Sequence, residues 1–273
     1  MRQLRHTARI TRSAAAAAIL AAALGGCQTT AQSPDITGSL SGPRDAQASI
    51  PVDAGTAAID ALGERYRANP RDADAALRYG QALRANGQRA QAVAVLEAAS
   101  LSNPSNKALL ALYGRALADN GNFKQAFDTL SRAHTPADPD WSILSVQGTT
   151  LDQMGRHEEA RRYYASALKI RPDEPSVLSN LGLSYMLTKE LARAEEVLRR
   201  AYAGGGSNDT RIRQNLALVV GLQGRFPEAE SIIKSDLPPD EAAANVAYLR
   251  QMLSRDGARP GARADRPEAT GRS

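Results

Sequence analysis

The sequence predicts an all-α solenoid of about five helix-turn-helix repeats, with capping helices at both ends. The main observation is a period of 34 residues that appears in three independent columns. The columns hold glycine at Gly80, Gly114, Gly148 and Gly182, alanine at Ala92, Ala126, Ala160 and Ala194, and a bulky apolar residue at Leu96, Leu130, Tyr164 and Leu198. Self-similarity at a fixed period of this length is typical of solenoids, in which one supersecondary unit is stacked on the next.

Each unit is expected to contain two amphipathic helices joined by a tight turn. In the first unit, the segments 75–86 and 89–100 have helical apolar spacing. Gly87 stands between them, where a helix end favours a left-handed residue. A glycine inside a helix costs about 1 kcal/mol relative to alanine. The column that starts at Gly80 therefore indicates a close helix contact, and we expect Ala92 to lie opposite it.

The pattern of the columns resembles the tetratricopeptide repeat. Small residues occupy positions 8, 20 and 27 of each unit, apolar residues occupy positions 7, 11 and 24, and proline occupies position 32 in two of the units. The tryptophan often found at position 4 is replaced by Ala76, Leu110, Leu144 and Leu178. The resemblance implies an α-solenoid whose concave face, lined by the first helix of each repeat, binds protein.

Residues 1–26 are interpreted as a lipoprotein signal peptide. An arginine-bearing start precedes the apolar run 14–24, which is too short to span a bilayer as a helix. The run ends in Leu-Gly-Gly-Cys27, which resembles a bacterial lipobox, and Cys27 is the only cysteine. We therefore expect Cys27 to carry the lipid; the alternative is an incidental cysteine. Because Gln28 follows it, resemblance to Gram-negative lipoproteins implies the outer membrane, facing the periplasm.

The remaining boundaries follow from composition and register. The formal net charge of +5 falls to about +1 once the four arginines of the signal peptide are set aside, so no nucleic-acid partner is expected. The expected segments are a flexible tether at 27–55, an N-terminal half-repeat or cap at 56–72, repeats at 73–106, 107–140, 141–174, 175–208 and 210–243 (73–243 together), a capping helix at 239–256 and a disordered tail at 257–273.

No enzymatic activity and no cofactor or metal are expected. His157, Glu158 and Glu159 are adjacent, so they diverge on a helix surface, and no second histidine has metal-ligand spacing. A solvated helix start is the preferred interpretation of His157. Glu195 and Arg199 are interpreted as an ordinary surface pair one helical turn apart. The alternative of a membrane-held enzyme accessory is left open for a test at residues 157–159.

The first helix of each repeat supplies the candidate peptide groove. Side chains at positions 2, 5, 9 and 12 should point into it, and the chosen set is Leu77, Gln81, Arg84, Arg115, Thr149, Leu183, Met186, Gln214 and Leu218. The groove would be mildly basic at its N-terminal end and apolar near Leu183, which suits a peptide with apolar anchors. The alternative is that the leucines pack between repeats. Asn180 and Asn215 have no matching lysine, so no carboxylate clamp is expected.

Nearly the whole mature chain resembles the tetratricopeptide lipoproteins of tight-adherence (Flp) pilus assembly in Gram-negative bacteria. The resemblance rests on the lipobox, on residues 35–39 (Asp-Ile-Thr-Gly-Ser) and on the C-terminal stretches 214–225, 237–239 and 242–249. It implies a pilotin-like lipoprotein that helps the pilus secretin reach or assemble in the outer membrane. The alternative is a lipoprotein adaptor for outer-membrane protein insertion, or for envelope proteases and cell-wall hydrolases. No small-molecule substrate is expected in either case.

Overall fold

The computed structural model describes residues 52–257, all of which belong to one compact unit of the chain. The expected signal peptide, Cys27, residues 27–51 of the tether and residues 258–273 of the tail lie outside the described residues. The described part contains helices and no named strand. The helices are α1 (Val52–Ala68), α2 (Ala73–Ala85), α3 (Arg89–Ser102), α4 (Lys107–Asp119), α5 (Phe123–Ser131), α6 (Trp141–Gln153), α7 (His157–Ile170), α8 (Pro175–Leu187), α9 (Leu191–Ala203), the short 3₁₀ helix η2 (Gly206–Asn208), α10 (Thr210–Leu222), α11 (Phe226–Ile233) and α12 (Pro239–Gly257).

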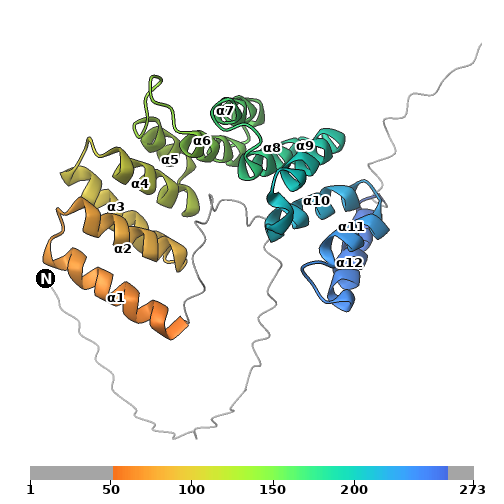
Figure 1. Ribbon diagram of the computed structural model, residues 1–273, viewed down its shortest axis with the longest axis horizontal. Helices are drawn as coiled ribbons and strands as arrows, with labels where there is room; N and C mark the ends of the chain where they lie inside the picture. The colour runs from red at the N-terminus through yellow and green to blue at the C-terminus, as the bar shows by residue number, and fades with distance from the viewer. Residues whose placement is uncertain (1–51, 258–273) are drawn as a thin grey trace, which may run out of the picture. The chain divides into compact units, whose positions relative to one another are not determined.

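The helices form five antiparallel pairs, α2–α3, α4–α5, α6–α7, α8–α9 and α10–α11, and each pair packs on the next (Figure 1). The first helices of neighbouring pairs also contact one another directly, from α2 through α4, α6 and α8 to α10. The second helices of neighbouring pairs have no comparable contacts in the described part. The first helices therefore form one continuous face of the stack. The predicted all-α solenoid is confirmed.

The glycine column exists because a bulky side chain from the partner helix crosses it. A Cβ atom added at Gly80 would lie 2.6 Å from the side chain of Leu96, and one at Gly148 would lie 2.5 Å from the ring of Tyr164. The residue expected opposite Gly80 was Ala92, but the nearest side chain is that of Leu96. In the second repeat the carbonyl oxygen of Ala126, the equivalent of Ala92, also lies 3.4 Å from a Cβ added at Gly114. The contact comes from the residue sixteen positions after each glycine, because a small residue on one helix makes room for a large one on the other.

The turn inside each repeat needs a residue in the left-handed region. Gly87, Gly121 and Gly155 have φ values of 74°, 84° and 74°, and Gly224 has 82° in the fifth repeat. The fourth repeat places Lys189 there instead, with φ of 63°. A side chain in this conformation is strained by about 1–2 kcal/mol. At this turn the fourth repeat therefore carries a backbone strain that the other four avoid.

Local side chains determine where the first helices begin. Asp72, Asn106, Asp140 and Asp209 each accept a hydrogen bond from backbone N–H groups in the first turn of the helix that follows. Such N-caps stabilise a helix by about 1 kcal/mol. The fourth repeat instead starts with Pro175 in the first helical turn, where the missing N–H does no harm. The second helices begin directly after the left-handed turn and have no side-chain cap.

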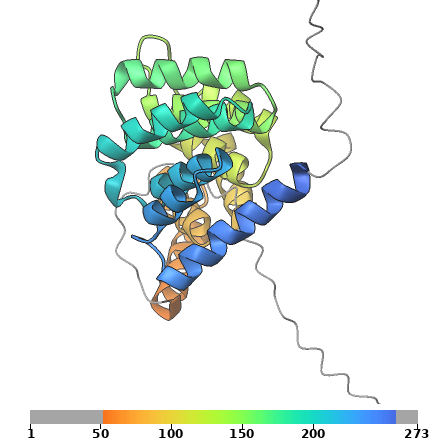
Figure 2. The same ribbon diagram turned by 90° about the vertical axis from the view of Figure 1, so that its right-hand side faces the viewer.

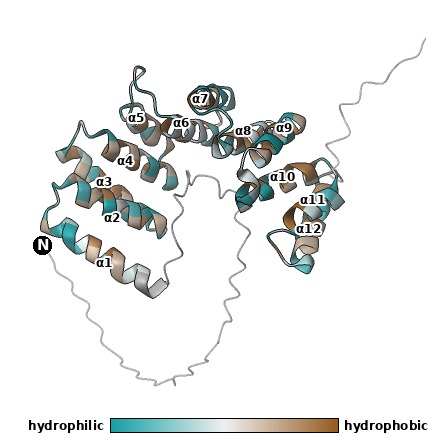
Figure 3. Cartoon of the chain, in the orientation of Figure 1, coloured by the Kyte–Doolittle hydropathy of each residue, from teal (hydrophilic) through white to brown (hydrophobic). Residues whose placement is uncertain are grey.

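Both ends of the stack are covered by single helices. α1 begins at Val52, inside the segment expected as tether, and its Ile59, Leu62 and Tyr66 pack on the first repeat. At the other end α12 lies against α10 and α11 (Figure 2), burying Ala242 and Val246. The helices carry hydrophobic and hydrophilic stretches side by side (Figure 3), as amphipathic elements of a stack do. None of the helices in the described range combines the length and hydropathy needed to cross a bilayer.

Candidate functional site

The candidate site is the surface of the first helices, called here the first-helix face: the side chains of α2, α4, α6, α8 and α10 that point away from the second helices. The nine predicted groove residues do not share one environment. Gln81 and Gln214 are exposed, Leu77, Arg84, Arg115, Leu183, Met186 and Leu218 are half-buried, and Thr149 is buried. The Thr149 hydroxyl donates to the carbonyl of Val146, 2.9 Å away in the same helix.

The two arginines expected to make the N-terminal end basic are engaged between repeats. Arg84 of α2 donates through Nε to Asp119 of α4 at 2.7 Å, and both side chains are largely buried. Arg115 of α4 donates to the hydroxyl of Ser142 in α6 at 2.8 Å. The charge of Arg84 is thus compensated by a carboxylate of the next repeat, and this end of the face is less basic than its arginine count suggests.

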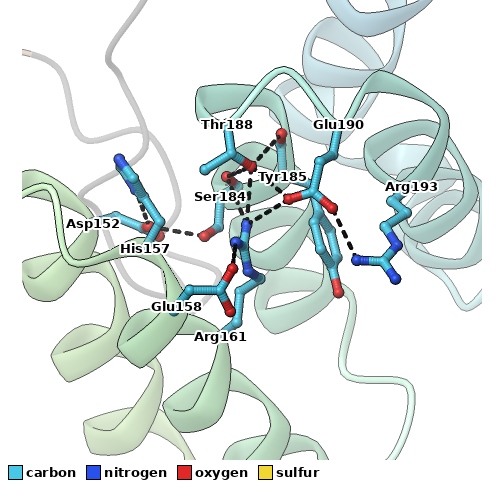
Figure 4. A network of polar contacts seen from close by, with 9 residues as sticks. All are labelled: Asp152, His157, Glu158, Arg161, Ser184, Tyr185, Thr188, Glu190 and Arg193. Atoms are coloured by element: carbon cyan, nitrogen blue, oxygen red, sulfur yellow. Dashed lines mark hydrogen bonds and ion pairs between the residues drawn. The ribbon is translucent and has the colours of Figure 1, made fainter.

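Asp152, at the end of α6, is the centre of a buried polar network (Figure 4). Its carboxylate accepts hydrogen bonds from Tyr164 of α7 and Ser184 of α8, both at 2.8 Å, and lies 2.8 Å from Nδ1 of His157. Burial, followed by the charge of Asp152, raises the pKa of Tyr164 well above its usual value. His157 does begin α7, but its ring is bonded and only 26% of the side chain is exposed, so the solvated interpretation was incomplete.

The same view shows how the third repeat is joined to the fourth (Figure 4). Arg161 of α7 donates to the Thr188 hydroxyl at 3.0 Å and pairs with Glu190 at 3.4 Å. The ring of Tyr185 lies between the guanidinium groups of Arg161 and Arg193, which are 4.9 and 5.5 Å from its centroid. Hydrogen bonds from Thr188 and Arg193, with the charges of Arg161 and Arg193, lower the pKa of Glu190. These side chains pair their charges and hydrogen bonds with one another and so stabilise the junction between the third and fourth repeats.

The fourth and fifth repeats are joined through Glu195 of α9. Its carboxylate pairs with Arg225 and accepts from Gln223 at 2.8 Å, both beyond the end of α10, besides bonding Arg199 on its own helix at 2.8 Å. Hydrogen bonding to Arg225 is the largest cause that lowers the pKa of Glu195 to about 2. Glu195 is therefore not an ordinary surface residue paired along one helix, as the sequence suggested, but the link between two repeats.

Two amides on the first-helix face are also used inside the stack. The side-chain amide of Asn180 donates to the hydroxyl of Ser145 at 3.2 Å, and that of Asn215 donates to Ser179 at 3.0 Å. Each bond joins a first helix to the one before it. These are the two asparagines considered for a carboxylate clamp, and their amides are committed to the scaffold.

An apolar part of the face is a patch of four leucines on α8 and α10. Leu183 and Leu187 are one turn apart on α8, and Leu218 and Leu222 are one turn apart on α10, which contacts α8. Leu187 is 52% exposed and the other three are half-buried. Leu187 and Leu222 were missed from the sequence, although their shared repeat position could have revealed them.

Met186 differs from the four leucines. It is half-buried and packs against the apolar cluster of the last two repeats, so much of this side chain belongs to the core. Among the described residues, no group of three or more histidine, cysteine or acidic side chains is placed to hold a metal ion.

Comparison with known families and structures supports the repeat assignment. The family described as tetratricopeptide repeat matches residues 146–209, and the family of anaphase-promoting complex (cyclosome) subunit 3 matches residues 58–133. No curated protein matches the chain. The fold is a tetratricopeptide-repeat solenoid.

Three solved structures illustrate the similarity of fold. PilW, a widely conserved type IV pilus biogenesis factor, is 16% identical with a TM-score of 0.62, and the match covers 71% of this chain and 91% of PilW. The match to the Cut9–Hcn1 hetero-tetramer of the anaphase-promoting complex has 14% sequence identity and a TM-score of 0.60. It covers 74% of this chain but only 41% of the other. The match to a thermophilic tetratricopeptide-repeat protein of Thermus thermophilus has 24% sequence identity and a TM-score of 0.54. It covers 66% of this chain and 96% of the other. At these identities the likeness establishes the fold.

Proposed function

We propose that the chain is a lipid-anchored tetratricopeptide scaffold that assists the assembly or outer-membrane localisation of the tight-adherence (Flp) pilus machinery by binding a protein partner. The observation that carries the binding role is the leucine patch of Leu183, Leu187, Leu218 and Leu222. At the same positions of α4 the chain has Arg115 and Asp119. A local switch from charged residues to leucines on an open helix face is what an apolar peptide anchor requires.

Three further features support the pilus role. The lipobox at Cys27 would attach the scaffold to the outer membrane on its periplasmic side. The fold is similar to that of PilW, a type IV pilus biogenesis factor. The C-terminal stretches 214–225 and 242–249 resemble TadD, the tetratricopeptide lipoprotein of tight-adherence pili. The partner is then the pilus secretin or another component of the same machinery, with no enzymatic step and no nucleic acid.

The first experiment measures the secretin multimer in outer-membrane fractions of cells with and without this protein. Loss of the multimer, or its movement to the inner membrane, is expected, and Cys27→Ala should reproduce the defect if the lipid is required. Protein levels of the variant are followed in parallel, so that degradation is not taken for mislocalisation. An unchanged multimer contradicts the pilus role and directs attention to the adaptor alternative, with other envelope proteins as clients.

The second experiment tests the patch itself. The triple change Leu183→Gln, Leu187→Gln and Leu218→Gln should weaken capture of the secretin by at least about tenfold while thermal unfolding stays cooperative. Ile170→Gln is the matched control, because this residue is 40% exposed on the second helix α7. If the triple variant unfolds instead, the leucines stabilise the core and the binding assignment is wrong.

A further inference from the structure

The first repeat differs from the third at two consecutive positions near the end of the second helix. In the third repeat Leu168 is half-buried and packs against the apolar cluster that contains Leu144 and Val177, and Lys169 follows it at the surface. In the first repeat the same two positions hold Ser100 and Leu101. Ser100 is too small to fill the space, and Leu101 is 80% exposed, the highest value of any large hydrophobic residue in the described part. A hollow and a protruding apolar side chain therefore lie side by side.

The hollow is a cavity of about 390 Å³ between the second helices α3 and α5, and residues of α4 form its floor. Its apolar lining comes from Leu101, Pro104 and Leu110, beside the ring of Tyr113. Ser100 is only 8% exposed and its hydroxyl has no hydrogen-bond partner. A buried hydroxyl without a partner is unfavourable and is rare in native proteins. This cavity is near the lower end of the range for binding pockets, about 300–1,000 Å³, and suits a side chain better than a large ligand.

Charges of opposite sign stand on the two walls of this cavity. Glu97 is on α3 and Arg132 directly follows α5, and both are exposed and line the cavity. Asp128 of α5 lines it as well, but its carboxylate pairs with Lys124 on its own helix at 3.3 Å. The 34-residue register equates Glu97 with Ser131, so Arg132 is only one residue away from the same height on the opposite wall. A two-fold axis running along the groove would bring Glu97 of one copy opposite Arg132 of the other, and the reverse. The surface is thus complementary to itself in charge.

We propose that this groove between α3 and α5 is the contact surface for a second copy of the chain, with Leu101 of each copy seated in the cavity of the other. An interface of this kind is isologous, because the same surface is used on both sides. The neighbouring hollow, apolar protrusion and opposite charges are the three elements that such self-docking needs. The groove lies on the second helices, away from the leucine patch, so a dimer leaves the first-helix face free. Because the contact is small, the dimer is weak.

The test measures the mass of the full chain in detergent micelles by light scattering, over a series of protein concentrations. Ser100→Leu should fill the cavity as Leu168 does in the third repeat, and Leu101→Asp should remove the apolar side chain. Each is expected to weaken dimerisation by at least about tenfold. Ile170→Asp is the matched control, since Ile170 is a 40% exposed apolar residue near the end of the second helix α7 and lies outside both the cavity and the leucine patch. Circular dichroism melting checks that Ser100→Leu remains folded.

A charge exchange gives an independent readout. Glu97→Arg alone and Arg132→Glu alone should each weaken the dimer, and the combination of both should restore it. A chain that stays monomeric at every accessible concentration overturns the proposal. So does a dimer that persists unchanged in Ser100→Leu and Leu101→Asp, because its cause would then be the micelle or another surface.

Discussion

The seam between the fourth and fifth repeats can be tested by replacing Glu195 with glutamine. The change keeps the size of the side chain and part of its hydrogen bonding, but it removes the charge that pairs with Arg225. Two repeats meet at this carboxylate, since Gln223 and Arg225 follow α10 while Glu195 belongs to α9. Loss of the charge should therefore loosen the junction rather than one helix.

The size of the effect follows from the pKa of Glu195, which falls from 4.5 to about 2 in the folded chain. Each unit of pKa difference between the folded and unfolded states corresponds to about 1.4 kcal/mol, which gives a ceiling of about 3.5 kcal/mol. Arg225 is 41% exposed, and solvent screening lowers the value further. We expect Glu195→Gln to lower the free energy of unfolding by about 1–2 kcal/mol at pH 7.

The pH dependence has a defined sign. The folded pKa of Glu195 is depressed, so its contribution is fully present above about pH 4.5 and is lost as pH falls toward 2. Urea denaturation followed by circular dichroism at several pH values between these limits measures the difference between wild type and variant. Glu196→Gln, at the neighbouring residue, is the control and should change stability by less than about 0.5 kcal/mol. Equal stabilities at pH 7, or a difference that grows on acidification, would refute the reasoning.

Three further changes test the packing, each read from the midpoint of denaturant unfolding. Gly148→Ala should destabilise by about 1–3 kcal/mol despite the better helix propensity of alanine, because the new Cβ meets the Tyr164 ring at 2.5 Å; a stabilised variant would contradict this. Lys189→Gly should stabilise by about 0.5–1 kcal/mol by relieving the left-handed strain, and a loss of stability would count against it. Asp152→Ala should destabilise by about 2–4 kcal/mol because three polar neighbours lose their acceptor, and near-neutral behaviour would remove Asp152 from the centre of the network.

The repeat pattern was sufficient to predict the helices, because the period, the left-handed glycines and the small-residue columns all report local geometry. It was not sufficient to predict the partner of each glycine. The prediction placed Ala92 opposite Gly80, whereas the side chain of Leu96 fills that space. The columns in a sequence show where small and large residues recur. They do not show which residue of the second helix packs on each glycine, because that depends on how the two helices are placed in the folded structure.

The polar junctions were hidden because they depart from the repeat. One position of the second helix holds Val93, Phe127, Arg161 and Glu195 in successive repeats, changing from apolar to charged. When the repeats are compared by the residue types they share, a position that varies in this way gives no signal. Asp152 is equally hard to recognise, since its place in the repeat points to the groove and says nothing of the tyrosine and serine that bury it.

Because of this change, the contacts that this position makes differ between the N-terminal and the C-terminal repeats. Val93 packs into the apolar cluster of the first repeats, and the ring of Phe127 meets that of Tyr163 with centroids 5.5 Å apart. Arg161 and Glu195 hold their junctions through ion pairs whose partners Glu190 and Arg225 are 34% and 41% exposed, so salt can weaken them. The first junction also has an ion pair, Arg84–Asp119, but both side chains are largely buried and salt screens it less. In a stack stabilised by nearest neighbours, rising ionic strength should open the C-terminal repeats first, and amide hydrogen exchange there should accelerate before exchange near α2. The leucine-bearing repeats are then the ones most able to shift apart and admit a partner.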